Sequence, residues 1–345
     1  MSHDRTLRTG ARTAGTVLLA ALAVLDLAWI VRDFDKATDV IDAWWMWSGL
    51  IFRAQDGIWA SSFVEPTLLV LYTVCAVTTA VSSSAGGILV STGALTILLR
   101  VPTLWNLNAS WVRSGVSDGL RNTVLASVIA MLVIGAALIV LALAGRLPRR
   151  SSGGRPEAED SGGARSTRGD RSTRDEPPAR PTRAGGAVAC GLLAAVTAVL
   201  VSWEVHAATR QGWELYSRHF TGDRSLATLL AVPESWYGCA LALVSLCAAV
   251  AALARTPYSR PLGMTVSGPL LGLGLFRLSF GAKAGLLGGF GGLTTRDQLW
   301  LSTAAFEILA AFGILLALSA RDGDTTTGPE AQSGTTRALS SASSA

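Results

Sequence analysis

Eight long apolar segments constrain this chain more than any other feature of its sequence. Each approaches the ~20 residues that an α-helix needs to cross the hydrocarbon core of a bilayer. In lipid the backbone N–H and C=O groups must pair within such a segment, which a helix achieves. We therefore predict an all-α, polytopic integral membrane protein. Its eight transmembrane helices are expected at residues 13–31, 66–82, 86–104, 120–144, 185–205, 235–254, 262–280 and 299–320.

A polar stretch at residues 146–183 divides these segments into two groups of four. It is rich in arginine and proline and has almost no apolar residues, so it cannot bury enough surface to offset its ordering entropy. The predicted organisation is a basic cytoplasmic arm at 1–12, a four-helix repeat at 13–145, a disordered cytoplasmic linker at 146–183, a second four-helix repeat at 184–320 and a disordered cytoplasmic tail at 321–345.

The distribution of arginine predicts the orientation of the chain. With 50% hydrophobic and 15% charged residues, the composition excludes an ordinary soluble protein. The net charge of +5 arises from arginines in the arm, the linker and the turn with Arg255 and Arg260, as the positive-inside rule expects. We therefore expect a multi-pass protein of the cell membrane with both termini and the linker in the cytoplasm, and no nucleic-acid partner.

The two halves show signs of an internal duplication. Each match is short, but all occur in the same order and at a nearly constant offset, which predicts two parallel repeats. The sequence LLAA followed by tryptophan occurs at 18–29 and again at 192–203, Arg100 is paired with Arg277 in the third helix of each half, and Asp118 is paired with Asp297 at the start of the fourth.

Six ionisable residues fall within or at the ends of the apolar segments, all toward the predicted outer side. A charged side chain facing lipid costs roughly 2.5–3.5 kcal/mol on insertion scales, so these groups face the protein interior or reach the interface. They form either a polar pocket or structural ion pairs, with snorkelling as a further possibility for the arginines. The six are Asp26, Arg100, Glu204, His206, Arg277 and Glu307.

All eleven tryptophans are predicted on the outer side. An aromatic belt at the membrane interface is one interpretation. It does not explain why Trp44, Trp45 and Trp47 cluster near Asp39 and Asp42. Ring faces attract cations, so an aromatic pocket with carboxylates suits a bound ammonium or a carbocation.

Cofactor chemistry has little support in the sequence. The four cysteines, Cys75, Cys190, Cys239 and Cys247, lie in apolar segments without a CxxC pair, which predicts buried packing residues. Only three histidines occur, and the spans contain no aspartate-rich metal motif. We expect no metal and no cofactor.

The stretch LLRVPTLWNLNASWVRSGVSDGLRNTVL, from the third to the fourth helix, resembles a family signature. It is similar to the helix–loop–helix region of the horizontally transferred transmembrane helix family, relatives of the vitamin-K-dependent carboxylase. Asn106 and Asn108 occupy the turn, and Gly115, Asp118 and Leu120 open the next helix. The carboxylase's catalytic lysine has no counterpart here. Some bacterial integral-membrane terpene cyclases are similar to that group, which implies an enzyme acting on an isoprenoid.

The leading functional expectation is a membrane enzyme of the terpene-cyclase type. Asp26, Glu204 or Glu307 would protonate an olefin or epoxide, and the tryptophans would stabilise the cation. Substrate contacts are expected from Trp44, Trp45, Trp47, Arg100, Asp118, His206 and Arg277. The alternatives are a transporter or binding protein for a small cationic or lipidic solute, and a membrane accessory or immunity protein without chemistry.

Overall fold

The structure is a computed structural model that describes residues 7–51, 58–109, 112, 115–145, 181–223 and 228–319. Eight helices in these ranges, of 18 to 29 residues, are long and apolar enough to cross a membrane, which confirms the predicted fold class. They are α1 (Thr9–Lys36), α3 (Val64–Val81), α4 (Ala85–Asn106), α6 (Asp118–Ala144), α7 (Arg183–Gln211), α9 (Glu234–Leu253), α10 (Ser259–Lys283) and α11 (Thr295–Ser319).

Two of the spanning helices extend well beyond their predicted ends. Helix α1 continues past residue 31 to Lys36, and α7 continues past residue 205 to Gln211. With 29 residues, α7 is about 43 Å long, whereas the hydrocarbon core of a bilayer is about 30 Å thick. One or both ends of α7 therefore extend beyond the hydrocarbon region, where polar residues do not interrupt a helix.

The described parts of the predicted loops contain three short helices that hydrophobicity did not indicate: α2 (Val40–Trp47), α8 (Trp213–Thr221) and the 3₁₀ turn η1 (Phe290–Gly292). Helix α2 begins where the Asp39 side chain accepts a hydrogen bond from the Ile41 backbone N–H, a typical N-cap. Helix α8 follows Gly212, whose φ of +79° permits a sharp turn away from α7.

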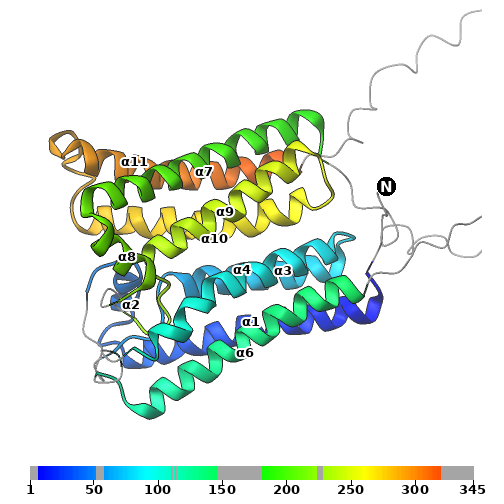
Figure 1. The fold of residues 1–345 in the computed structure, drawn as a ribbon, viewed down its shortest axis with the longest axis horizontal. Coiled ribbons are helices and arrows are strands. Elements are labelled where there is room, and N and C mark those ends of the chain that lie inside the picture. The colour runs from blue at the N-terminus through cyan, green and yellow to red at the C-terminus, as the bar shows by residue number, and fades with distance from the viewer. Residues whose placement is uncertain are drawn as a thin grey trace, which may run out of the picture.

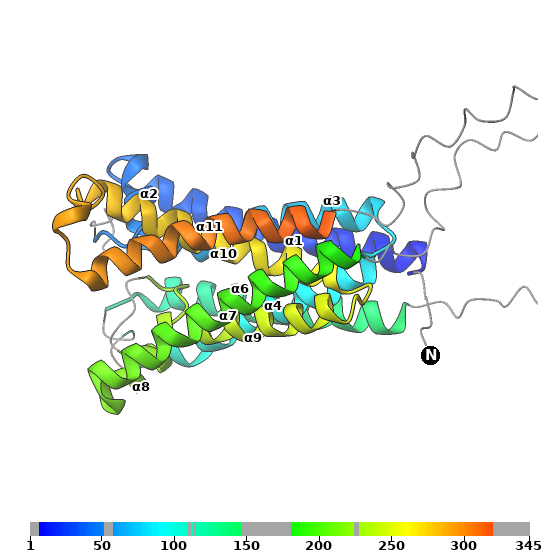
Figure 2. The same cartoon turned by 90° about the horizontal axis from the view of Figure 1, so that it is seen from above.

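The bundle has two distinct ends (Figures 1 and 2). The terminal end holds the first residues of α1 and α7 and the last residues of α6 and α11. The opposite end, here the tryptophan end, holds α2, α8 and the turn between α10 and α11. Three parts of the predicted organisation lie wholly or partly outside the described residues. They are residues 1–6 of the arm, residues 146–180 of the linker, and the tail from residue 321.

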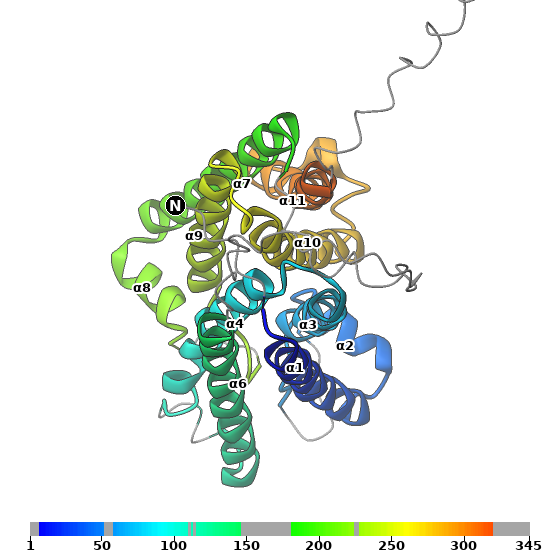
Figure 3. The same ribbon diagram turned by 90° about the vertical axis from the view of Figure 1, so that its right-hand side faces the viewer.

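The two halves pack by the same scheme. Helix α1 pairs with α3 and α4 with α6, just as α7 pairs with α9 and α10 with α11. Figure 3 shows the halves side by side, with α4 and α10 at the centre. Across this centre the hydroxyls of Ser91 and Thr265 lie 2.8 Å apart. A contact of this kind between corresponding central helices is what two repeats related by a two-fold axis produce.

The buried faces of corresponding helices define the register between the halves. In α1 and α7, buried Gly15, Leu19, Leu22 and Asp26 correspond to buried Ala189, Leu193, Val196 and Leu200. In α3 and α9, buried Leu68, Tyr72 and Ala76 correspond to buried Leu241, Ser245 and Ala249. In α4 and α10, Leu95, Thr96 and Leu99 correspond to Pro269, Leu270 and Leu273.

This register corrects two pairings that the sequence suggested. The counterpart of Arg100 is Gly274, one helical turn before Arg277. The counterpart of Met131 on α6 is Glu307 on α11, which sets Asp118 opposite Thr294 and not opposite Asp297. The pairing from sequence fails because positions one helical turn apart lie on the same side of a helix. Residue identity alone therefore does not show which of two such positions corresponds to Arg100 or to Asp118.

The cysteines also depart from the prediction of uniform burial. Cys75 is buried, Cys190 and Cys239 are half-buried, and Cys247 is exposed; all four are free thiols. An apolar segment has a protein-facing side and a lipid-facing side. Residence in such a segment therefore does not determine burial.

Candidate functional site

The six ionisable residues in the spans lie in two separate places. Asp26 and Arg100 lie in the first half, and the other four lie in or beside a cavity of the second half: Glu204, His206, Arg277 and Glu307. The first cluster is a triad in the first half, formed by Arg100 with Asp26 and Glu65. Nη2 of Arg100 lies 2.9 Å from Oδ1 of Asp26, and Nη1 lies 2.6 Å from Oε1 of Glu65. All three side chains are fully buried, so the arginine does not snorkel. This cluster is a closed structural ion-pair site.

Glu65 was not among the predicted site residues because the sequence placed it in a loop. Its Oε2 accepts hydrogen bonds from the backbone N–H and the hydroxyl of Ser62, and the Ser62 hydroxyl accepts one from the Val64 N–H. This is the reciprocal arrangement of a capping box at the start of α3. The spacing Ser62-x-x-Glu65 before an apolar segment was therefore the signal that identifies it.

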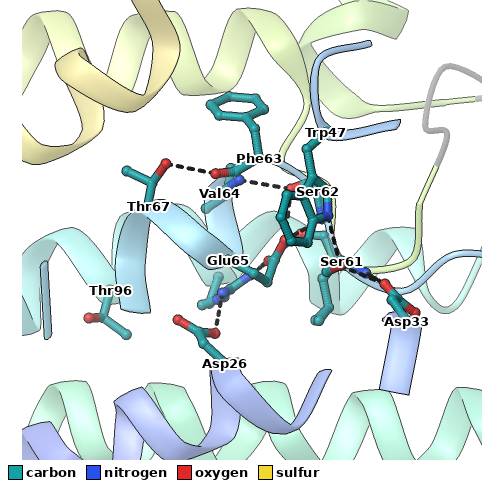
Figure 4. A network of polar contacts seen from close by, with 12 residues as sticks. Asp26, Asp33, Trp47, Ser61, Ser62, Phe63, Val64, Glu65, Thr67 and Thr96 are labelled. Carbon is teal, nitrogen blue, oxygen red and sulfur yellow. Dashed lines mark hydrogen bonds and ion pairs between the residues drawn. The ribbon is translucent and has the colours of Figure 1, made fainter. Parts of the chain in front are cut away.

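A second buried carboxylate, Asp33, fixes the segment that leads into α3 (Figure 4). It accepts hydrogen bonds from the Ala60 N–H, the Ser61 N–H and, at 2.5 Å, the Ser61 hydroxyl. Trp47 in turn donates its indole N–H to Ser61 at 3.0 Å. Asp33 thus attaches this segment to α1, and Trp47 attaches α2 to the segment.

The second half contains a cavity of about 800 Å³ that reaches the tryptophan end. Its walls come mainly from α7, α9, α10 and α11. The first half contributes Trp47 of α2, the following Ser48 and Gly49, and Phe63. Ligand pockets in proteins typically measure about 300–1,000 Å³. The size of the cavity suits a small organic ligand.

The residues of the cavity form layers of different polarity. The innermost positions, judged by their distance along each helix from the tryptophan end, are apolar: Leu200, Gly238 and Leu273. The rim is polar. It comprises Arg210, Gln211, His219, Glu234 and Arg296. Between floor and rim lie the aromatic side chains of Trp47, Phe63, Trp203, Tyr237 and Phe276.

Glu204 lies in the aromatic middle layer. Its Oε1 sits directly against Gly238, in space that a Cβ at residue 238 would fill. Its Oε2 is buried and has no hydrogen-bond partner among the described residues. The side chains of Ser235 and Tyr216 face the carboxyl group. Burial raises the pKa of the Tyr216 phenol.

The ion pair of Arg277 and Glu307 adjoins the cavity. Nη1 of Arg277 lies 2.8 Å from Oε1 of Glu307. The arginine side chain lines the cavity and is 20% exposed, whereas that of Glu307 is 2% exposed. Arg277 is therefore accessible to a ligand, and Glu307 is engaged with it from behind.

The other predicted site residues are distributed unevenly. His206 lines the cavity and meets Trp203 edge-on, with ring centroids 5.9 Å apart. The ring centroids of Trp44 and Phe276 lie 4.9 Å apart, and Nζ of Lys283 lies 4.7 Å from the ring centroid of Trp45.

Besides Glu307, five predicted residues do not line the cavity: Trp44 and Trp45, which pack beside it, and Asp26, Arg100 and Asp118. Asp26 and Arg100 belong to the closed triad. Asp118 is exposed at the start of α6, where it pairs with Arg121.

The register between the halves explains why the cavity exists. The counterparts of Asp26, Glu65 and Arg100 are Leu200, Gly238 and Gly274. Leu200 and Gly238 line the cavity floor. At Gly274 a Cβ would come within 2.6 Å of the Ala304 backbone oxygen, so α11 packs closely there. The side chains that close the first half are thus replaced in the second half by one leucine and two glycines.

Glu204 has no acidic counterpart in the first half. The residue in register with it is Ile30, which is buried. The cavity therefore has uncharged floor residues where the first half has charged ones. It also has the Glu204 carboxyl group, where the first half has an apolar side chain.

Among the described residues, no group of three or more histidine, cysteine, aspartate or glutamate side chains is arranged to hold a metal ion. No protein-family profile, curated protein or solved structure matches the chain.

Proposed function

We propose that the protein is an integral-membrane enzyme that converts a lipidic isoprenoid by acid-initiated cyclisation in the second-half cavity. The observation that carries this proposal is the position of Glu204. Its carboxyl group lies in a cavity that several aromatic side chains also line, and its Oε2 has no partner in the described chain. One oxygen each of Asp26 and Glu307 is likewise unpartnered, so the distinction lies in the other oxygen. Asp26 and Glu307, the other candidate acids, are each within 3 Å of an arginine.

The reaction begins with a proton on the Glu204 carboxyl group. Transfer of this proton to an olefin carbon forms a C–H bond and leaves a carbocation; transfer to an epoxide oxygen opens the ring with the same result. The π electrons of a second double bond attack the cation and form a ring bond. Loss of a proton from a neighbouring carbon then gives a new double bond. The carboxylate of Glu204 is the nearest carboxylate of the middle layer to recover that proton.

Aromatic faces support the cationic stages. The rings of Trp47, Trp203 and Phe276 lie in the same layer as Glu204, and a cation within about 6 Å of a ring centroid is stabilised by the ring quadrupole.

The proposed orientation follows from the arginines of the arm and the linker. It places the terminal end in the cytoplasm and the tryptophan end outside, in the cell membrane. The substrate would then reach the cavity from the outer leaflet.

The test is product analysis in an isoprenoid-producing host. Wild-type protein is expected to yield a cyclised product that the host alone lacks, and Glu204→Gln is expected to abolish it while the protein still accumulates. Glu214→Gln is the matched control, because Glu214 is exposed on α8 and pairs only with Arg218 in the structure. A Glu204→Gln variant with undiminished product would contradict the proposal.

A second candidate is a transporter or binding protein for a small cationic or lipidic solute. The observation that favours it is the site between helices of a repeated bundle, open at one end of the bundle. The two candidates differ in outcome. A transporter returns its solute chemically unchanged, whereas the enzyme yields a new hydrocarbon skeleton.

A further inference from the structure

We infer that the ligand of the second-half cavity is a single-chain amphiphile, bound with its apolar end on the floor and its polar head at the rim. This inference names the substrate class of the proposed function, but the binding it describes does not require that function. It rests on the order of polarity along the cavity and on the origin of its floor.

The cavity is deep along the membrane normal. Leu200 and Gln211 both line it and lie on the same helix, α7, which places them about 16 Å apart at the α-helical rise. A site of this depth suits an extended chain.

The three innermost lining residues, Leu200, Gly238 and Leu273, carry no charge. Leu200 stands where the first half has Asp26, and Gly238 stands where it has Glu65. In the first half these carboxylates hold Arg100, which fills the space. In the second half Leu200 and Gly238 supply no partner for a polar head, and the Glu204 carboxyl group already lies against Gly238, so burying a head there would cost its hydration with little compensation.

The rim supplies partners for a polar head. Among the described residues, neither Arg210 nor Arg296 makes an ion pair, and both are exposed where they line the cavity. Gln211 and His219 join them, hydrogen-bonded to each other at 2.8 Å. Because α7 is longer than the hydrocarbon core is thick, this rim can lie at the level of the lipid head groups.

Glu204 lies one helical turn above Leu200 on α7. An amphiphile seated on the floor therefore presents its inner part, and not its head, to the carboxyl group. In the proposed reaction the proton would go to a double bond remote from the polar end of the substrate.

The experiment measures chain-length preference by binding alone. Purified protein in lipid nanodiscs is mixed with geraniol, farnesol or geranylgeraniol, and the shift in thermal unfolding temperature gives the order of affinity. Leu200→Phe fills the floor and is expected to move the preferred alcohol to a shorter chain. Leu200→Ala deepens the floor and is expected to move it to a longer chain.

Val201→Phe is the matched control. Val201 is the next residue of α7 and is 46% exposed on the outer surface of the bundle, so the same substitution there should leave the order unchanged. The inference is overturned if no alcohol stabilises the wild type. It is also overturned if neither Leu200 variant changes the order, or if Val201→Phe changes it as much.

Glu204→Gln separates this inference from the proposed function. It should keep the wild-type order of binding while product formation is lost. Retained product in this variant would refute the catalytic role of Glu204 without touching the amphiphile site. An unchanged length preference in both Leu200 variants would refute the amphiphile site without touching catalysis.

Discussion

Replacing Arg100 by methionine should be the most damaging single substitution in the buried triad. The change leaves Asp26 and Glu65 facing each other in a site where both are fully buried. Removing one partner of a buried ion pair typically costs about 3–5 kcal/mol. Two carboxylates lose their partner here, so we expect the upper part of that range. The total stability of a folded domain is about 5–15 kcal/mol, so this loss is a large fraction of it.

Asp26→Asn should lower the stability far less than Arg100→Met does. Comparing the two variants therefore tests whether Arg100 is the group that holds the triad together. The Asn oxygen can still accept a hydrogen bond from Arg100, and Arg100 with Glu65 remains a neutral pair. We expect a cost below about 2 kcal/mol, comparable with one hydrogen bond to a charged group. The same variant also tests function: product formation should survive it, because Asp26 lies outside the cavity.

The assay is reversible unfolding of the purified protein in mixed micelles with increasing dodecyl sulfate. Arg121→Met is the control, since Arg121 pairs with the exposed Asp118 in an i,i+3 surface pair that contributes at most about 0.5 kcal/mol. Equal losses for Asp26→Asn and Arg100→Met would refute this account of the triad. A stable Arg100→Met protein would do so as well.

Three further predictions follow from the same structure. Glu307→Gln should lower stability by about 1–2 kcal/mol in the same unfolding assay, less than Arg100→Met, because Arg277 is partly exposed in the cavity and can be solvated. Asp33→Asn should cost about 2 kcal/mol and increase proteolytic cleavage near residues 58–62, because an amide cannot accept all three hydrogen bonds made there. A reporter fused after Arg165 should give a cytoplasmic signal and one inserted next to Trp45 an outside signal, and opposite signals would invert the proposed orientation.

The sequence was sufficient to predict the eight spanning helices, because the length of an apolar segment reflects the thickness of the bilayer. The sequence was not sufficient to predict the residues at which these helices end. Helix α1 passes through Arg32 and Asp33 without interruption, because the Asp33 side chain is satisfied by the segment before α3 and Arg32 pairs with it at 2.7 Å. Whether a charged residue ends a membrane helix depends on partners from distant parts of the chain.

The candidate site was predictable as a set of residues but not as an arrangement. The six ionisable residues named from the sequence included three carboxylates and two arginines, which did not determine which carboxylates would pair with an arginine. That depended on the faces by which the helices meet. Asp26 meets Arg100, Glu307 meets Arg277, and Glu204 meets a glycine. A pocket toward the outer side was expected, but its location in the second half was not, because it depends on small side chains whose significance appears only when the two halves are compared.

That comparison also explains how one repeated framework can hold both a rigid half and a binding half. In the first half the triad joins α1, α3 and α4 through ion pairs, and Asp33 fastens the adjoining segment. In the second half the corresponding helices lack those links, and α10 is held instead to α11 by Arg277 and Glu307. The ion pairs of the first half lie at the centre of its four helices, whereas that of the second half lies to one side, and the centre is open. Glu204 then replaces an apolar residue at the edge of that opening. The closed polar core and the lined cavity thus differ at these corresponding positions, while the helices of both halves pack in the same order.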